Sequence, residues 1–457
     1  MARGKKKETL TPEDRLQAAL VPESAQPYPV PENWCWTYLG CVSDVVTGGT
    51  PSKKHPEYYG GLFPFFKPTD LDFGRHVVEA SEYLTDEGKM VSRIIPEQST
   101  AVCCIGSIGK CGFLEVEGTT NQQINSAIPK FNPLFLYYYC NTHYFNEELW
   151  SKASATTISI VNKSKMESCV FPLPPLPEQQ RIVDRIESLF AKLDEAKQKA
   201  QDALDSFETR KAAILHKAFT GELTAQWRKK HSIGMESWET KKLSEVSTLQ
   251  TGLMKGKNYS GKTVMLPYLR VANVQDGFLN LSEIKEIEVS GELIDRYSLK
   301  NGDVLFTEGG DYDKLGRGTV WQGQIKNCLH QNHVFVVRPQ ADVLSPYFLS
   351  YQAGSRYGKQ YFLKCSKQTT NLASINSTQL KGFPVLMPTI EEQAQIVLLI
   401  DDLLAKEQQA KEAAEGVLDQ IDLIKKAILA RAFRGELGTN NPSEESAVEL
   451  LKQISSC

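Results

Sequence analysis

The sequence has little that would support a metal centre or a disulfide framework. It contains ten cysteines and seven histidines, but no two cysteines form a CxxC pair and no histidine lies at a metal-ligand spacing from them. We therefore expect no metal site. Cys103, Cys104, Cys111 and Cys140 are expected to be free and buried, because a thiol packs as a small apolar side chain.

A membrane segment and a targeting sequence are also missing. The basic residues near the N-terminus are not followed by an apolar run, and no later stretch is long enough to cross a bilayer. The sequence predicts a cytoplasmic protein with no membrane partner. With 457 residues, of which 41% are hydrophobic, the chain is long enough for two or three domains.

Catalytic motifs are lacking as well. No GxGxxG follows a predicted strand, and no Asn or Asp precedes a Pro-Pro-aromatic triplet, so methyltransferase motifs are missing. The glycines of Gly106–Lys110 are too close together for a phosphate-binding loop, and Cys111 stands where Ser or Thr would bind magnesium. Asp70, Asp72 and Glu79 lie near one another, but no basic residue completes a nuclease site. We expect a chain that is not catalytic alone.

The charge balance lacks an excess of cations. The net charge is −3 and the pI is near 6.2, whereas a protein that binds nucleic acid alone usually carries an excess of Lys and Arg. This argues weakly against nucleic-acid binding. The objection loses force if basic residues gather on one surface, or if a partner supplies most phosphate contacts.

What the chain does contain is an internal duplication. Residues 156–223 match a segment 214 positions later without a gap, so that Glu178-Gln179 returns as Glu392-Gln393. Earlier in each copy the shift is 204 or 203, and the matched residues are Trp34 with Trp238, Leu39 with Leu243, Gly48 with Gly252, and Pro64–Lys67 with Pro267–Arg270. The regions between these constant frames diverge, as is expected if they select different targets.

The pattern predicts an α+β protein with a pseudo-twofold internal repeat. Short runs of β-branched and aromatic residues between Gly and Pro indicate two β-rich domains, with helices near 135–139, 145–149, 347–351 and 357–363. The predicted segments are an N-terminal extension and linker (1–33), a first domain (34–177), a long helix (178–223), a connector (224–237), a second domain (238–389), a second long helix (390–437) and a C-terminal tail (438–457).

Each predicted long helix is uninterrupted for about forty residues, or roughly 60 Å, and carries a heptad stripe. Thr389 and Glu392 form a capping-box pattern, Gly221 and Gly435 are predicted left-handed caps, and Glu407 breaks the second stripe. The predicted packing residues are Ile182, Ile186, Leu189, Leu193, Phe207, Ile214, Ile396, Ile400, Leu403, Val417, Ile421 and Ile428.

Two apolar stripes of this length require a partner, so we expect the two long helices to pair antiparallel as a coiled coil that joins the β-rich domains. In the alternative arrangement, each helix would cover only its own domain. A short domain is a poor match for so long a stripe.

Polar clusters in each β-rich domain are of the type that contacts DNA. Asn and Gln amides pair with adenine edges, and Lys and Arg meet phosphates. Taken singly, each is also explained as a solvated loop residue or a turn cap. The predicted DNA-contacting residues are Lys53, Lys54, Lys67, Asn121, Gln122, Gln123, Asn125, Lys163, Lys165, Lys255, Lys257, Arg270, Asn273, Gln331, Asn332 and His333.

Residues 34–437 resemble the specificity subunit of type I restriction-modification systems. The resemblance rests on the helix-starting motif at 174–182 and its copy at 388–393, and on the helix-ending motifs Phe219–Leu223 and Phe433–Leu437. It implies that each β-rich domain is a target-recognition domain for one half of a split DNA sequence, and that the paired helices act as a spacer. No base-contacting position is transferable by motif, because the recognition loops vary within the family.

The resemblance also implies the partners. Two methyltransferase subunits would bind the constant frame and supply S-adenosylmethionine and adenine methylation, and restriction subunits would supply ATP-dependent cleavage with Mg²⁺. This chain is then expected to bind double-stranded DNA and to hold no cofactor of its own.

Two other functions remain open at this point. An enzyme with an unusual site would bind S-adenosylmethionine, or cleave DNA with magnesium, as an isolated chain. A coiled-coil scaffold or peptide-binding protein without DNA specificity would form its complexes without competition from any duplex.

Overall fold

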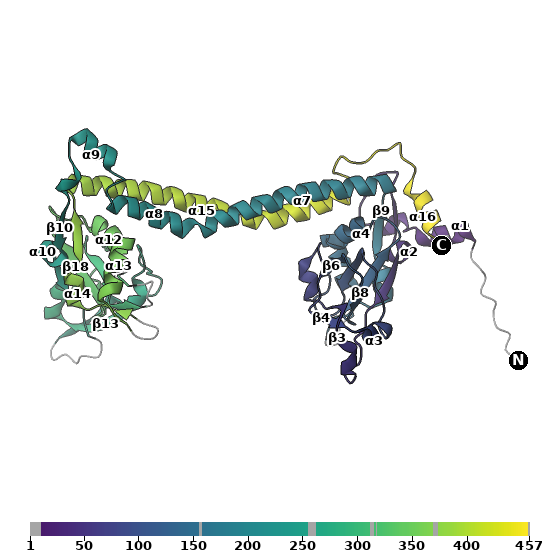
Figure 1. Cartoon of the computed structure of the whole chain (residues 1–457), viewed down its shortest axis with the longest axis horizontal. Coiled ribbons are helices and arrows are strands. Elements are labelled where there is room, and N and C mark those ends of the chain that lie inside the picture. The colour runs from purple at the N-terminus through teal and green to yellow at the C-terminus, as the bar shows by residue number, and fades with distance from the viewer. Residues whose placement is uncertain are drawn as a thin grey trace. The chain divides into compact units, whose positions relative to one another are not determined.

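The chain divides into two compact units, which we describe separately. The computed structural model describes residues 11–154, 158–254, 262–310, 315–316, 318–368 and 373–455. The first unit comprises residues up to 199 together with those from 416 onward, and the second comprises Ala200–Glu415. Figure 1 labels many of the helices and strands of both units. Each long helical segment therefore contributes residues to both units.

The first unit is built on two small sheets. One is antiparallel, with the order β2-β8-β5-β6, and consists of β2 (Ser43–Thr47), β8 (Ile124–Pro129), β5 (Ser99–Cys103) and β6 (Cys111–Leu114). In the other, β3 (Tyr59–Phe66) lies between β4 (Glu82–Leu84) and the parallel strand β7 (Thr119–Thr120). A ribbon of β1 (Cys35–Tyr38) and β9 (Val170–Leu173) joins the two ends of the domain.

Short helices complete the first domain. They are α2 (Leu39–Val42), α3 (Asp86–Met90), α4 (Pro133–Cys140), α5 (His143–Lys152) and α6 (Lys163–Glu167). The helices predicted near 135–139 and 145–149 are confirmed by α4 and α5. Helix α4 begins where the Asn132 side chain accepts hydrogen bonds from the amides of Leu134 and Phe135.

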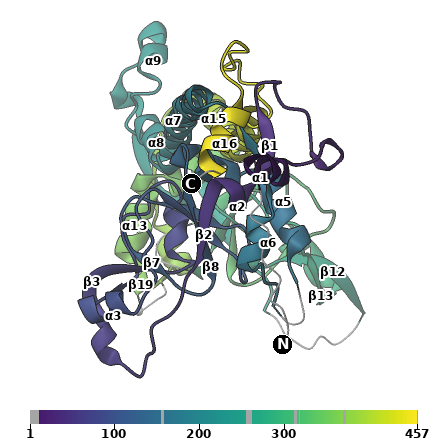
Figure 2. The same ribbon diagram turned by 90° about the vertical axis from the view of Figure 1, so that its right-hand side faces the viewer.

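The N-terminal extension is part of the first unit. Helix α1 (Pro12–Ala19) starts with a capping box between Thr11 and Asp14, and it packs against the last helix, α16 (Ala447–Ser455) (Figure 2). The hydroxyl of Thr37 donates to the carbonyl of Ala19 at 2.8 Å. Since this segment has no copy in the second half of the sequence, it adds to the first unit a layer that the repeat does not provide.

The second unit repeats the strand orders of the first. Its antiparallel sheet has the order β11-β18-β14-β16, made of β11 (Ser247–Gln250), β18 (Val334–Pro339), β14 (Val304–Thr307) and β16 (Gly318–Val320). Its second sheet consists of β13 (Lys285–Ser290), β12 (Thr263–Leu269) and the parallel strand β17 (Leu329–His330). Strands β10 (Glu239–Lys242) and β21 (Pro384–Met387) form the closing ribbon.

The second unit also contains a further small sheet and several short helices. A small sheet contains β15 (Gly309–Gly310), β20 (Ala373–Ser374) and β19 (Lys367–Gln368), and the helices are α9 (Ala225–His231), α10 (Leu243–Val246), α11 (Ile294–Tyr297), α12 (Pro346–Gly354), α13 (Arg356–Cys365) and α14 (Ser377–Lys381). Helices α12 and α13 confirm the helices predicted near 347–351 and 357–363.

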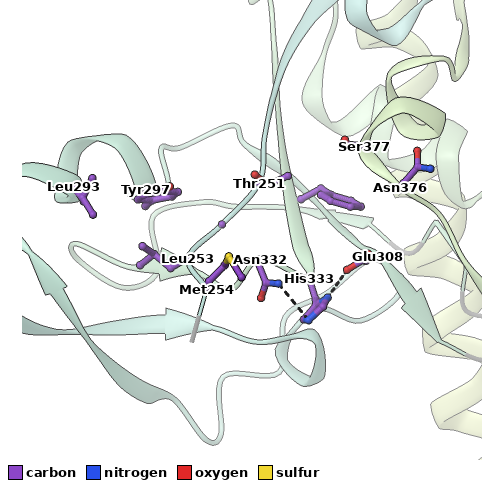
Figure 3. A pocket seen from close by; sticks show the side chains of 12 residues that line it. Thr251, Leu253, Met254, Leu293, Tyr297, Glu308, Asn332, His333, Asn376 and Ser377 are labelled. Atoms are coloured by element: carbon purple, nitrogen blue, oxygen red, sulfur yellow. Dashed lines mark hydrogen bonds and ion pairs between the residues drawn. The ribbon is translucent and has the colours of Figure 1, made fainter. Parts of the chain in front are cut away.

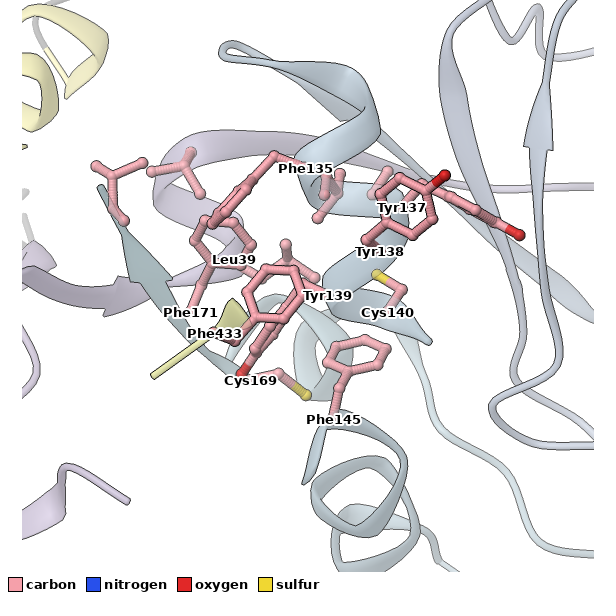
Figure 4. Close-up of a cluster of buried hydrophobic side chains, with 14 of the residues drawn as sticks. Leu39, Phe135, Tyr137, Tyr138, Tyr139, Cys140, Phe145, Cys169, Phe171 and Phe433 are labelled. Carbon is pink, nitrogen blue, oxygen red and sulfur yellow. The ribbon is translucent and has the colours of Figure 1, made fainter. Parts of the chain in front are cut away.

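The core of the first domain contains an aromatic ring from the end of the second long helix. Phe433 is 1% exposed, and its ring centre lies 4.9 Å from that of Phe135 and 5.2 Å from that of Tyr139 (Figure 4). The same cluster contains Ile182 and Ile186 from the start of the first long helix. The first domain is therefore sealed by the beginning of one helix and the end of the other.

The second domain is sealed in the same way. Phe219 lies at the end of the first long helix, and its ring centre is 5.4 Å from that of Phe348. The same cluster contains Ile396 and Ile400 from the start of the second long helix. The arrangement in which each helix covers only its own domain is wrong, because the buried Phe of each helix-ending motif packs into the other domain. These motifs are core residues, which explains their repetition.

The repeated Gln at each helix start holds that helix to its domain. Gln179 donates to the carbonyl of Pro174 at 2.9 Å and accepts from the amide of Asn132 at 3.1 Å. Gln393 makes the equivalent bonds to Pro388 at 3.0 Å and Ser345 at 2.9 Å. Both glutamines are fully buried, so these bonds satisfy polar atoms that would otherwise destabilise the core.

The repeated Glu at each helix start binds the segment that follows the other long helix. Glu178 accepts from the hydroxyl of Thr439 at 2.6 Å, and Glu392 accepts from the hydroxyl of Thr224 at 2.6 Å. The Thr389 hydroxyl accepts from the Glu392 amide at 3.3 Å, so one half of the predicted capping box is present. The carboxylate half of that box is wrong, since the oxygens of Glu392 bond to Thr224, Arg228 and Trp238.

The first long helix is not continuous, contrary to the prediction. It consists of α7 (Leu176–Asp205) and α8 (Phe207–Phe219), whereas α15 (Ile390–Ala432) is unbroken. At the break, the Ser206 hydroxyl donates to the carbonyl of Asp202 at 2.7 Å, and Arg210 donates to the carbonyl of Ala203 at 3.1 Å. Side-chain donors that bond helix carbonyls compete with the backbone ladder, which accounts for the interruption.

The long helices pair antiparallel within each unit. In the first unit, the Lys425 ammonium lies 5.0 Å from the centre of the Phe190 ring on α7. In the second, Lys411 lies 5.0 Å from the Phe207 ring, and Arg210 lies 2.6 Å from Glu407. Glu407 therefore does not break the stripe, because it forms an ion pair across the helix pair.

One predicted packing residue is wrong. Val417 is 41% exposed, whereas the next residue, Leu418, is half-buried. The contact between the long helices also includes lysines, because the ammonium groups of Lys411 and Lys425 lie over aromatic rings. A pattern of apolar residues alone does not identify these lysines. Among the other predicted residues, the buried ones are Ile182, Ile186, Ile396, Ile400 and Ile421, and the half-buried ones are Leu189, Leu193, Phe207, Ile214, Leu403 and Ile428.

The cysteines of the described residues are all free thiols, and Cys103, Cys104, Cys111 and Cys140 are buried as predicted. Burial raises the pKa of Cys111 to about 12, so this thiol stays protonated near neutral pH. Within the same described ranges, no helix combines the length and apolar composition needed to cross a bilayer.

Candidate nucleic-acid interface

In the first unit, the loop after β2 packs directly against the loop after β7. The amide of Gly48 donates to the carbonyl of Ile124 at 2.9 Å, and the amide of Gly49 donates to Thr120 at 2.8 Å. A Cβ atom at Gly48 would lie 2.2 Å from the carbonyl oxygen of Asn121, so this approach requires glycine. We call residues 48–55 and 121–123 the first loop pair.

Several predicted DNA-contacting side chains lie together on the first loop pair. Lys53, Lys54 and Gln122 are exposed, and Gln123 is half-buried. The Thr50 hydroxyl donates to Gln122 and so connects the two loops. This surface combines cations, which suit phosphates, with amides, which suit base edges.

Two predicted contacts in this region are wrong. Asn125 is 2% exposed, and its amide group accepts from the hydroxyl of Thr47 at 2.8 Å and donates to the carbonyl of Val161 at 3.3 Å. Asn121 is 8% exposed and bonds to Gln123 through both ends of its amide. Both asparagines stabilise the loops from within, because neither amide faces solvent.

Two of the other predicted cations of the first unit have acidic partners in the fold. Lys67 lies 2.9 Å from Glu82, and Lys163 lies 3.5 Å from Glu167 within α6. Lys165 is half-buried on the same helix, and its amide donates to the capping Asn162 at 2.9 Å. None of these bonds connects Lys67, Lys163 or Lys165 to the first loop pair.

The acidic residues near β3 also have structural partners. Buried Asp70 accepts from the amides of Lys67 at 2.7 Å and Ser81 at 3.0 Å, and Asp72 lies 2.7 Å from Lys110. In the part of the chain that the structure describes, no three His, Cys, Asp or Glu side chains gather as a metal site would require.

The second unit has an equivalent loop pair, residues 252–254 and 331–333. The amide of Leu253 donates to the carbonyl of His330 at 2.9 Å, and the amide of Asn332 donates to Leu253 at 2.9 Å. A Cβ atom at Gly252 would lie 2.2 Å from the carbonyl oxygen of His330. The same close approach of two backbones therefore occurs in both domains, and we call this the second loop pair.

The second loop pair borders a cavity of about 440 Å³ (Figure 3). His333 is exposed and bonds to Glu308, and its other ring nitrogen lies 3.3 Å from the amide nitrogen of Asn332. The cavity is lined by Thr251, Gly252, Leu253, Met254, Leu293, Tyr297, Glu308, Asn332, His333, Phe335, Asn376 and Ser377. The lining combines apolar side chains with a few polar ones, which is typical of a binding surface.

The remaining predicted residues of the second unit differ in placement. Gln331 is half-buried, and its backbone N–H donates to the carbonyl of Leu269 at 2.9 Å. Arg270 is paired with Glu283 at 3.5 Å, and its side chain is 22% exposed. Lys255 and Lys257 lie outside the described residues.

The prediction for Asn273 is wrong. It is 3% exposed, and its amide nitrogen donates to the carbonyls of Asn280 at 2.9 Å and Glu283 at 3.0 Å. Its oxygen accepts from the Arg270 amide at 2.9 Å, as Asp70 accepts from Lys67 in the first unit. A buried turn residue of this kind has the same side-chain chemistry as an adenine reader, so sequence alone did not separate the two roles.

Two arginines beside the loop pairs were missed by the sequence analysis. Arg93 donates to the carbonyl of Thr47, which precedes Gly48, and the carbonyl of Arg296 accepts from Gln250, which precedes Thr251. Both side chains are exposed. They lie 203 positions apart, which is the shift that relates Pro64–Lys67 to Pro267–Arg270, so the duplication itself held the signal.

The comparisons with known proteins agree with this architecture. Residues 31–204 and 235–415 each match the family model described as the type I restriction modification DNA specificity domain. The chain belongs to this family. The two matches contain the two loop pairs, and the α+β fold with an internal repeat is confirmed.

Two relatives cover nearly the whole chain. The EcoKI type I restriction enzyme specificity subunit of Escherichia coli is 25% identical over 454 residues, which is 93% of this chain and 95% of the relative. The StySPI type I restriction enzyme specificity subunit of Salmonella potsdam is 24% identical over 450 residues, with the same two coverages. The similarity therefore extends over both domains and both long helices.

A solved structure has the same fold. The HsdS subunit from Thermoanaerobacter tengcongensis superposes with a TM-score of 0.63 at 21% sequence identity, covering 90% of this chain and 99% of that one. At this identity the likeness supports the architecture only.

Proposed function

We propose that this chain is the DNA-recognition subunit of a type I restriction-modification assembly. Each domain recognises one half of a split double-stranded target through its loop pair. The long helices act as the spacer between the two half-sites.

The observation that carries the proposal is the presence of one scaffold with two different surfaces. Both domains have the same strand orders and the same glycine-dependent loop pair. The side chains on the pairs differ, with Lys53, Lys54 and Gln122 in the first and Asn332 and His333 in the second. Two domains that share a scaffold but carry different loop side chains suit a DNA target whose two halves differ in sequence.

Catalysis is assigned to partner chains. Two methyltransferase subunits supply S-adenosylmethionine and transfer methyl groups to adenine, and restriction subunits use ATP and Mg²⁺ to cleave unmodified DNA. The chain itself is proposed to be non-catalytic and to bind no cofactor. The paired acids near β3 support this division, because Asp70 and Asp72 already bond to the fold.

The test is to map methylated adenines across the genome in cells with and without this chain. We expect a split target whose modification requires the chain. Exchanging residues 34–175 for another such domain should then change one half of that target and leave the other intact. If the purified complex with its methyltransferase shows no preference among duplexes, the proposal fails and the scaffold function is favoured.

A further inference from the structure

We propose that Arg93 and Arg296 are a matched pair of phosphate-contacting residues, one in each domain, that fix the register of each half-site on the DNA. The inference rests on the proposed function and extends it to named residues. Three observations support it. The two arginines occupy equivalent positions, they form no ion pair with an acidic residue among the described residues, and they are the same residue type in both domains whereas the loop side chains differ.

Arg93 is held beside the first loop pair. It follows α3, and its guanidinium donates to the carbonyl of Thr47 at the end of β2. The next residue, Gly48, is fixed by its 2.9 Å bond to Ile124 and by its contact with the opposite loop. A guanidinium anchored to a rigid backbone loses little freedom on binding a ligand, so it is prepared for an anion.

Arg296 is held beside the second loop pair by different bonds. Its carbonyl accepts from the side chain of Gln250, at the end of β11. Its guanidinium lies 5.4 Å from the ring centre of Tyr297, which lines the cavity next to Leu253 and Asn332. A cation over an aromatic ring is attracted to the ring face, and this contact leaves the N–H donors of the guanidinium available.

The two arginines differ from several cations that lie near them in the sequence or in the same sheet. Many neighbouring cations are neutralised by carboxylates, as in Lys89 with Glu117 at 2.7 Å, Arg75 with Glu115 at 2.7 Å, and Arg338 with Asp303 at 2.6 Å. Among the described residues, the Arg93 and Arg296 guanidinium groups form no ion pair, and their partners are the Thr47 carbonyl and the Tyr297 ring. An exposed and unneutralised guanidinium beside a recognition loop favours an anionic ligand.

The ligand is a phosphate and not a base, because the residue type is the same in both domains. Residues that distinguish bases are expected to differ between two domains that recognise different sequences, as the loop residues do. The sugar-phosphate backbone is the part of the DNA that both half-sites share. Arginine also matches phosphate with a bidentate pair of N–H donors.

The test measures binding of the full chain, in complex with its methyltransferase partners, to the target duplex and to an unrelated duplex. Fluorescence anisotropy is recorded from about 50 to 200 mM salt, the range in which phosphate contacts are readily resolved. The variants are Arg93→Gln and Arg296→Gln, which keep an amide donor for local bonds and remove the charge. Each should weaken binding to both duplexes by roughly tenfold and lower the salt slope by about 0.9.

Matched controls separate this role from a structural one. Lys89→Gln and Lys285→Gln remove neighbouring cations that already have acidic partners, and they should leave the salt slope unchanged. Arg93→Lys and Arg296→Lys should restore the slope, since the charge is retained. Melting curves of each complex confirm that the variants are folded.

The outcomes are distinguishable. An unchanged slope in a folded Arg93→Gln or Arg296→Gln complex overturns the phosphate contact, and so does a loss confined to the target duplex, which would indicate base recognition. A wild-type complex that binds both duplexes equally refutes the proposed function, while its salt slope still decides the role of the arginines. A wild-type complex that binds neither duplex refutes both.

Discussion

A buried glutamate is repeated at the start of each long helix, and the two units bond it to different partners. In the second unit, Glu392 is fully buried and pairs at 2.6 Å with Arg228, whose side chain is 8% exposed. In the first, Glu178 pairs with Arg181, which is 37% exposed and also pairs with Glu444 at 2.8 Å. Burial raises the pKa of Glu178, and its bonds to Thr439 and Arg181 oppose that rise.

The comparison shows what the repeat preserves. Thr224 and Arg228 follow α8, and Thr439 and Glu444 follow α15, so the start of each long helix is bound to the segment that follows the other. The connection is preserved although the participating side chains differ. The second unit makes it within a buried pair, whereas the first makes it with a more exposed network that includes the C-terminal tail.

The largest effect is expected where an aromatic ring seals a domain. Phe433→Ala should lower the free energy of unfolding of the first unit by about 4 kcal/mol, because it leaves a cavity among Phe135, Tyr139 and Phe171. Phe219→Ala should cost the second unit less, since Phe219 is 7% exposed against 1% for Phe433. Urea unfolding of both variants tests this order, and equal losses would contradict it.

The buried ion pair should give the next largest effect. Arg228→Ala leaves the Glu392 carboxylate buried without its cation, and it should destabilise the second unit by about 3 kcal/mol. Arg181→Ala should cost less, about 1 kcal/mol, because the Arg181 side chain is more exposed than that of Arg228 and Glu178 keeps its bond to Thr439. Thermal unfolding of the single variants and of the Arg228→Ala/Glu392→Ala double variant would measure the coupling. A coupling near zero would show that the pair does not hold the helix start.

The two units should also differ in their response to acid. Burial lowers the pKa of His330 from 6.5 to about 4, whereas its counterpart in the parallel strand pair of the first unit is Thr120. The folded state holds His330 neutral, so the stability it provides is present above pH 6.5 and is lost as the pH falls toward 4. The second unit should lose about 2 kcal/mol between pH 7 and pH 5 from this group.

The matched variant is His330→Thr. Urea unfolding at pH 7 and pH 5 should show a smaller loss on acidification in this variant than in the wild type. An identical loss in both proteins would mean that His330 does not cause the pH dependence.

The smallest effect is expected in the helix pair of the second unit. Glu407→Gln removes the charge that faces Arg210, but both side chains are partly solvated. The loss of stability should be below about 1 kcal/mol. Circular dichroism melts at low and high salt would measure it. A loss of several kcal/mol would show that the pair is effectively buried.

The candidate interface was predictable only in part. The sequence indicated polar loops around Lys53, Lys54 and Gln122, and these side chains are exposed on the first loop pair. It could not separate them from Asn125 and Asn273, since an amide that satisfies a buried carbonyl has the same chemistry as one that faces a base. Burial separates them, and burial depends on contacts between distant segments.

The duplication, the α+β class, the approximate positions of the helices and the glycine at each helix end were all predictable from the sequence. Gly221 and Gly435 have φ values of 80° and 72°. These features are local, because they depend on residue spacing and on backbone conformations that only glycine adopts readily. The packing of each helix-ending Phe in the other domain, and the contacts of Lys411 and Lys425 across the helix pair, became evident from the folded structure. These facts depend on which surfaces meet, and the pattern along one helix does not specify its partner.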